Sequence, residues 1–298
     1  MGFTSIADWA DSPSVGKSHV TTFRKAVASA ATAANDFIDY TYYSGNPPAN
    51  FYASAPLVAA VVERDKGINI PLTDQYIHRL TVMTSASGAT STTNQNQRLL
   101  LADYLLYYPF VDTDAIGEEQ VMDNTVTLPR YTGAGVQMMV IAQSAASTNG
   151  AFTINYTNQD GVAGRVSKTT YTKIVAGGGI NLAYNVSGVT ASAHPFVGLQ
   201  AGDTGVQSVQ SVTFTLAGGG LMAVVLVKPL QHAMATQECR RTTTGNLESY
   251  GAATQVESII HKTPIEIKSG AVLGVIGLGN AGSLASSVLV GTLETIWS

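Results

Sequence analysis

The spacing of hydrophobic and polar residues divides the chain into two parts near residue 48. Between Ser18 and about Tyr40, apolar residues follow one another mostly at steps of three and four: Val20, Phe23, Val27, Ala30, Ala34 and Phe37. This spacing is typical of one side of an α-helix. Ser18 can cap the first turn, and the Gly and Pro residues over 45–48 can end the helix. The pattern predicts an amphipathic helix over residues 18–40.

The apolar stripe of this predicted helix is a candidate interface, formed by Val20, Phe23, Val27, Ala34 and Phe37. Packing of the stripe on the chain's own domain is the simpler interpretation. The alternating three-four spacing also fits a short coiled-coil seam, in which alanine permits close approach of a second helix. The stripe could then hold a neighbouring copy, for example in a trimer.

Beyond residue 50, apolar residues alternate with polar ones or form short continuous runs, as β-strands do. Ten such segments are predicted strands: 78–84, 98–108, 136–142, 151–157, 162–172, 206–216, 220–230, 259–267, 271–278 and 287–293. Many short strands separated by turns indicate a sandwich or a barrel. We therefore expect a mainly β fold: an antiparallel β-sandwich or jelly-roll-like barrel over residues 49–298, preceded by an arm over residues 1–48 that carries the helix.

Turn residues indicate how two pairs of strands are connected. Asp160 and Gly161 lie between two alternating segments, and a glycine there suits a positive φ. The run from Ala217 to Gly220 links two further segments, which predicts a second hairpin. Within 206–216 the alternation slips by one position near Val209, which indicates a β-bulge.

Charge is scarce in this chain. Only 12% of its residues are charged, against about 25% in ordinary domains. The net charge of -4 provides no broad basic field for a phosphate backbone, so we expect no nucleic-acid partner. No apolar run reaches the roughly 20 residues of a membrane-spanning helix, and the start of the chain lacks the pattern of a signal peptide. With the single cysteine Cys239, this predicts a protein of a reducing cytoplasm without a membrane partner.

Two glycine motifs resemble nucleotide-binding loops by their letters. Gly277-Leu-Gly279-Asn-Ala-Gly282 matches the dinucleotide fingerprint, but too few residues follow it for the helix, second strand and acidic residue that this fold needs. Gly16-Lys17-Ser18 matches only the end of a phosphate-binding loop. We predict no nucleotide site at either motif.

Candidate catalytic and metal-binding residues are scattered. The five histidines lie in separate segments without zinc-ligand spacing. A group of carboxylates over 112–119 could bind calcium, although it lacks the order of an EF-hand loop, and a solvated acidic loop is the favoured interpretation. No set of nucleophile, base and acid is present. We therefore expect a protein that is not an enzyme, with no catalytic residues, no cofactor and no metal.

Four segments of the chain resemble a family of virion structural proteins from tailed phages and prophages. They are TLPRYTGAGV at 127–136, NYTNQDG at 155–161, HPFVGLQAGDTGVQSVQSV at 194–212 and VKPL at 227–230. The segments keep the family's order, and the resemblance covers residues 125–230. Residues 231–298 depart from the family pattern.

The resemblance implies a protein of the virion, made in the cytoplasm of the host bacterium and placed in the capsid shell as a decoration, or cement, protein. Its implied partners are the major capsid protein lattice and further copies of itself, with a trimer as one possibility. The family provides no catalytic residues to assign.

Three other roles stay open from the sequence. The chain could be a major capsid subunit or a component of the tail or baseplate. It could also be a carbohydrate-binding or receptor-binding β module, because Trp9, Trp297 and thirteen tyrosines could stack on sugars. An enzyme is the least supported alternative.

Overall fold

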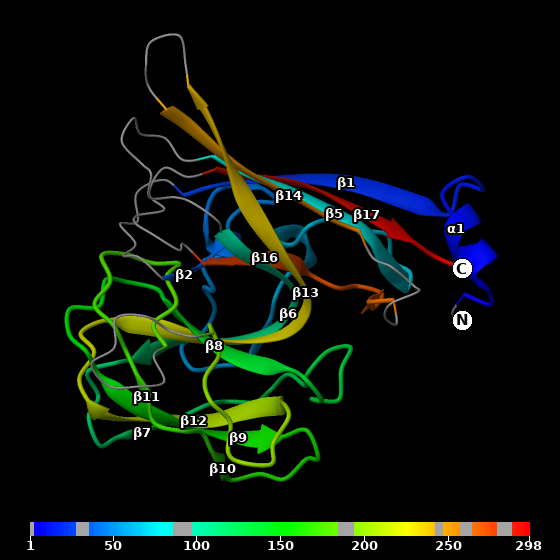
Figure 1. Ribbon diagram of the computed structural model, residues 1–298. Coiled ribbons are helices and arrows are strands. Elements are labelled where there is room, and N and C mark those ends of the chain that lie inside the picture. Colours follow the sequence, from blue (N-terminus) through cyan, green and yellow to red (C-terminus); the bar gives the residue numbers. More distant parts are fainter. Residues whose placement is uncertain are drawn as a thin grey trace.

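The computed structural model describes residues 3–27, 36–85, 97–183, 194–241, 247–256, 264–278 and 288–298. Antiparallel strands form two sheets, of which the larger has twelve strands within the described residues (Figure 1). Its main path runs β2 (Phe37–Asp39), β16 (Leu273–Leu278), β6 (Gln97–Asp112), β13 (Leu221–Arg241), β14 (Leu247–Val256), β5 (Gln75–Ser85), β17 (Val288–Ile296), β1 (Ser18–Ala26), β3 (Gly45–Asn46). Beside this path lie β4 (Ala60–Val61), β8 (Gln137–Ala142) and β15 (Glu266–Ile267).

The smaller sheet has five strands in the described part of the chain. Its order is β10 (Arg165–Val166), β9 (Ala151–Asn158), β12 (Val206–Leu216), β7 (Glu119–Val121), with β11 (Thr170–Tyr171) also beside β9. Helical structure is limited to α1 (Ile6–Asp11) and two 3-10 turns, η1 (Tyr40–Tyr42) and η2 (Arg64–Lys66), among the residues described. No described helix is long and apolar enough to cross a membrane.

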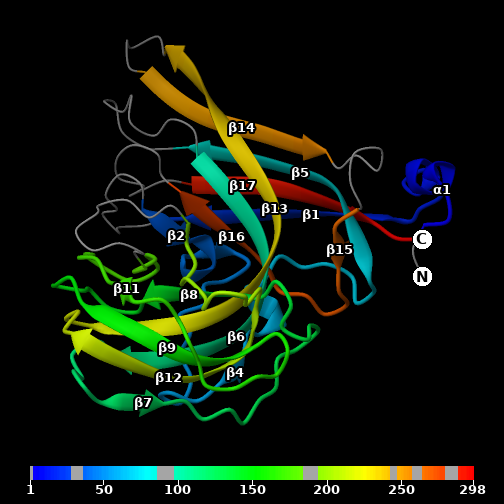
Figure 2. The same cartoon turned by 60° about the horizontal axis from the view of Figure 1, so that its bottom comes forward.

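The two longest strands, β6 and β13, hold the fold together. They pair antiparallel from Leu221 opposite Asp112 to Ala235 opposite Gln97, with three register shifts along the way. One part of β13 also pairs with β8, and a later part pairs with β14. Figure 2 shows β13 curving from the strands near the small sheet to the long strands of the opposite group. The large sheet therefore bends continuously between two packing partners.

The middle of this sheet is buried on both faces. Val224 and Leu226 belong to the core that contains the small sheet, whereas Val225 and Val227 belong to a second cluster on the opposite face. Strands covered on both sides consist of continuous apolar residues because neither face meets water. This burial explains why the segments 98–108 and 220–230 lack alternation.

The small sheet packs against this middle region and completes a sandwich. Phe152 and Phe214, from paired strands β9 and β12, are fully buried, and their ring centroids lie 5.1 Å apart. The predicted mainly β, antiparallel fold is confirmed. A register shift between Val209 and Ser211 confirms the predicted bulge. The turn at Asp160 and Gly161 joins the antiparallel pair β9 and β10, and Gly161 has φ +77°.

The predicted helix over residues 18–40 is wrong for the residues of this segment that the structure describes. Residues 18–26 form β1, which pairs with β17 along its whole length, and residues 37–39 form β2. The alternating burial of Phe23, Lys25 and Val27 is the period of a strand, and the β-branched residues over 20–22 favour one. Residues 28–35, including Ala30 and Ala34, lie outside the described part. The helix near the N-terminus is α1, which Ser5 caps by accepting the Asp8 N–H at 3.0 Å.

Two other expectations need correction. The run from Ala217 to Gly220 does not close a hairpin, because it links β12 of the small sheet to β13 of the large one. The predicted strand 162–172 is two short strands, β10 and β11. In the glycine motif, Gly277 lies in β16 and residues 279–282 lie outside the described residues. The division at residue 48 stays a prediction.

Candidate functional site

The first candidate site is the open edge of β1. Trp297 N donates to Lys17 O at 3.2 Å, and Ala26 N donates to Ser44 O at 2.9 Å. Because the backbone groups of a strand point to alternate sides, odd-numbered residues of β1 face β17 and even-numbered ones face away. On that outer side β3 pairs only with Arg24 and Lys25. The backbone N–H and C=O groups at positions 18, 20 and 22 therefore face an edge without a partner strand among the described residues.

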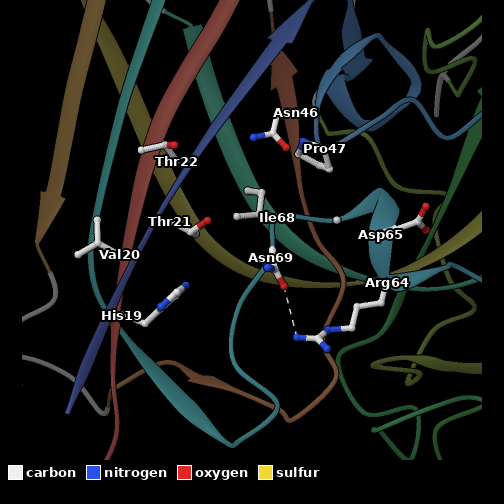
Figure 3. A pocket seen from close by; sticks show the side chains of 11 residues that line it. His19, Val20, Thr21, Thr22, Asn46, Pro47, Arg64, Asp65, Ile68 and Asn69 are labelled. Carbon is white, nitrogen blue, oxygen red and sulfur yellow. Dashed lines mark hydrogen bonds between the residues drawn. The ribbon is translucent and has the colours of Figure 1, made fainter. Parts of the chain in front are cut away.

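A groove of about 700 Å³ runs along this edge (Figure 3). Its lining comes from β1, from the turn at Asn46 and Pro47, and from the segment 64–69. Figure 3 shows His19 and Thr21 on the side of β1 that faces Asn69, with the Arg64 guanidinium at the far wall. Arg64 Nη2 donates to Asn69 Oδ1 at 3.4 Å.

The groove has the chemistry of a peptide-docking edge. An exposed edge accepts an extended segment through backbone hydrogen bonds, and side chains beside it select that segment. His19, Thr21 and Asn69 provide hydrogen-bond donors and acceptors, and the lining also contains the cation of Arg64 and the carboxylate of Asp65. Val20, which is 56% exposed, adds an apolar contact on the same strand.

Lys25 anchors the loop that forms one end of the groove. Its ammonium donates to four backbone oxygens: Thr41 at 3.5 Å, Tyr43 at 3.2 Å, Pro47 at 2.7 Å and Pro48 at 3.1 Å. Burial lowers the pKa of Lys25 to about 8, and nearby Asp39 opposes that shift. The amine thus holds the 41–48 loop against β1. From the sequence alone, Lys25 would be expected to be a solvated charge.

Asp39 is the carboxylate beneath this loop, and it is fully buried. It accepts hydrogen bonds from the hydroxyls of Thr41 at 2.6 Å and Tyr104 at 2.8 Å, and also from the Tyr52 hydroxyl. Burial raises the pKa of Asp39, whereas these hydrogen bonds lower it. The cluster connects β2 to β6 and is closed to solvent, so it positions the loop.

The second candidate site is a corner where the four family-like segments meet. Asp203 accepts from Tyr156 Oη at 2.6 Å, from Asn158 Nδ2 at 2.9 Å and from Arg165 Nε at 2.9 Å. The hydrogen bond from Arg165 is the main reason that the pKa of Asp203 falls to about 2. The segments 155–161 and 194–212 are thereby joined through one ionised carboxylate.

The other two segments connect to the same corner. Gln207 Nε2 donates to Thr132 O at 2.9 Å and to Gln159 O at 3.1 Å. Lys228 Nζ donates to Ala134 O at 2.8 Å. Segments distant in sequence, 127–136, 155–161, 194–212 and 227–230, therefore form one hydrogen-bonded unit. A groove of about 370 Å³ beside it is lined by residues that include Leu128, Tyr131 and Gln207.

The five predicted interface residues do not share one face. Val20 is exposed at the β1 edge, whereas Phe23 and Val27 are buried at 2% and 0% exposure. Phe37 is half-buried against the second core cluster, and Ala34 lies outside the described residues. Sequence reasoning missed His19, Arg64 and Asn69, because only the fold brings the 64–69 segment beside β1.

The chain was compared with known proteins. No protein family and no curated protein matches it. Two solved structures align weakly, both from infectious bursal disease virus. One, a mutant VP2 protein in derived T=1 particles, is 9% identical over 94% of this chain and 77% of its own, with a TM-score of 0.19. The other, the Gt strain, is 9% identical over 93% and 78%, with a TM-score of 0.17. Scores this low establish no common fold.

The acidic loop at 112–119 uses its carboxylates to fix turns. Asp112 Oδ1 accepts the Asp114 N–H at 2.8 Å, and Asp114 Oδ1 accepts the Gly219 N–H at 2.8 Å. Glu119 accepts from Ser211 Oγ at 2.6 Å. In the part of the chain that the structure describes, no three His, Cys, Asp or Glu side chains gather as a metal site.

Several of the tyrosines that suggested sugar binding are core residues. Those that are fully buried include Tyr40, Tyr52, Tyr104, Tyr108 and Tyr156. A buried ring cannot stack on a carbohydrate from solvent. These tyrosines therefore give the carbohydrate-binding alternative no support.

Proposed function

We propose that this chain is a structural protein of a tailed-phage virion, and specifically a capsid decoration protein that stabilises the head. The observation that carries the proposal is the corner around Asp203, where hydrogen bonds link the four family-like segments one to the next. Segments that form one structural unit give more support to a shared fold than four separate matches do. In this proposal the chain is not an enzyme, and it acts by binding to other proteins of the capsid.

The proposed partners are the major capsid protein lattice and further copies of this chain, within the virion. Repeated interfaces of about 1,200–2,000 Å² can hold a shell without any strong individual site. A surface with few charges limits repulsion between close-packed copies. The β1 edge is the proposed contact: an extended segment of a capsid subunit pairs with residues 18–22 and lies in the groove.

Protein composition of purified virions tests the proposed role. We expect hundreds of copies of this chain per particle, in a simple ratio to the major capsid protein, and density for it on the shell by cryo-electron microscopy. A dozen copies or fewer would contradict a decoration role and favour the tail or baseplate.

Proline at position 20 tests the proposed contact. The Val20 N–H faces the open edge, so Val20→Pro is expected to keep β1 paired with β17 while removing a donor that the added strand needs. Val20→Ala keeps this donor and is the matched control. We expect Val20→Pro to weaken co-sedimentation with undecorated capsids by ~10-fold relative to Val20→Ala. Equal binding of the two variants, at equal melting temperature, would exclude this edge as the contact.

A further inference from the structure

Asp36 and Lys173 form an ion pair in the interior of the protein. Asp36 precedes β2 and is 3% exposed, and Lys173 follows β11 and is 7% exposed. The Lys173 Nζ atom and the Asp36 Oδ1 atom are in direct contact. The two residues come from distant parts of the sequence, so this contact is a product of the fold.

The backbone holds both residues in place. Asn181 N donates to Phe37 O at 2.9 Å, and Asp39 N donates to Gly179 O at 2.9 Å, so the chain after Lys173 runs beside β2. Closer to Lys173, Val175 and Ala146 exchange two hydrogen bonds of 3.0 Å, and just before it Thr172 N donates to Gly150 O at 2.9 Å. The amine and the carboxyl are therefore presented to each other by anchored segments, which raises their effective concentration.

We propose that Lys173 and Asp36 condense to form an intramolecular isopeptide bond. The Nζ lone pair of the neutral amine attacks Cγ of the protonated carboxyl group, and a C–N bond forms. The C–O bond to the hydroxyl then breaks, and the hydroxyl leaves with a proton from the nitrogen as water. One water is lost, no atom changes oxidation state, and no other reactant is required.

The surroundings favour the reactive form of the amine. Burial lowers the pKa of Lys173 to about 8, which makes the neutral amine accessible near neutral pH. A buried pair that exchanges two charges for an amide also loses the desolvation cost of those charges. The bond would link the residue before β2 covalently to the segment that follows β11 of the small sheet.

Other ion pairs in the described residues lack this combination. Arg130 and Arg165 pair with buried carboxylates, but a guanidinium is a poor nucleophile because it stays protonated. Lys268 and Glu266 are in contact at 2.7 Å, yet their side chains are 36% and 38% exposed and meet water. Lys173 with Asp36 joins an amine to a carboxyl in a dry interior.

Intact mass of the full chain in denaturant tests the bond. We expect the wild-type mass to lie about 18 Da, one water, below the sequence mass, and proteolysis to give a branched peptide that joins Lys173 to Asp36. Lys173→Arg keeps the positive charge but removes the nucleophile, so its mass should equal the sequence mass. Lys268→Arg is the matched control and should retain the loss of water.

The mass of the wild-type chain is decisive without the variants, and it does not depend on the proposed virion role. A wild-type chain at its full sequence mass overturns the proposal by itself. A loss of water without the branched peptide, such as dehydration at a single aspartate, overturns it equally.

Discussion

Phe23→Ala is expected to lower the free energy of unfolding by about 3–5 kcal/mol, the usual cost of removing a buried phenylalanine. Phe23 is 2% exposed, and its ring covers Gly291 of the neighbouring strand β17, where there is no side chain to fill the space. The ring therefore belongs to the hydrophobic core and packs over β17. Denaturant unfolding of the dilute protein measures the loss.

Val20→Ala is the matched control on the same strand. Val20 is 56% exposed, so its truncation should change the free energy of unfolding by less than about 1 kcal/mol. Together the two variants distinguish Phe23, a residue of the core, from Val20, a residue of the proposed contact surface. Unchanged stability of Phe23→Ala, combined with weaker self-association, would instead place the ring at an interface.

Arg130→Ala is the second substitution for which we expect a large effect. The guanidinium donates to Asp103 at 3.0 Å and 2.7 Å and to Tyr104 O at 3.0 Å, and the Asp103 side chain is fully buried. Burial raises the pKa of Asp103, and the hydrogen bonds and charge of Arg130 oppose that shift. Without Arg130 the carboxyl group loses its counter-ion in the core. We expect a loss of about 3–5 kcal/mol in the free energy of unfolding.

Lys268→Ala provides the comparison for Arg130→Ala. It breaks an exposed pair with Glu266, and exposed pairs contribute roughly 0–1 kcal/mol. Thermal and denaturant unfolding of both variants should therefore differ clearly. Similar small losses in the two would show that the Asp103 carboxyl group finds water or another donor once the guanidinium is removed.

Sequence patterns predicted most long strands because those strands are either alternating or wholly apolar. The strand 206–216 matches β12 at both ends, and its bulge follows from the slip near Val209. The error over 18–40 has a clear cause: two apolar residues of β1, Val20 and Phe23, and Val27 directly after it fall by chance at helical spacing. The buried position between the last two is Lys25, a polar residue that a hydrophobic pattern counts as exposed.

The candidate site was less accessible to sequence reasoning. The β1 edge becomes open because β3 ends after Asn46, and no local pattern reports where a neighbouring strand stops. The groove needs Arg64 and Asn69 beside His19, a contact that only the tertiary fold makes. The segments that form the corner around Asp203 could be identified from the sequence by their resemblance to a family. The hydrogen bonds between these segments could not be predicted from it.

The long pairing of β6 with β13 has a mechanical consequence. Hydrogen bonds of an antiparallel pair lie across the strands, so a force along the strands loads many of them in shear at once. The pairing from residue 97 to residue 112 crosses both packing layers of the protein. Tension applied to the small-sheet layer and resisted at the far strands would therefore be shared along this ribbon, and the two layers would yield together rather than peel apart one bond at a time.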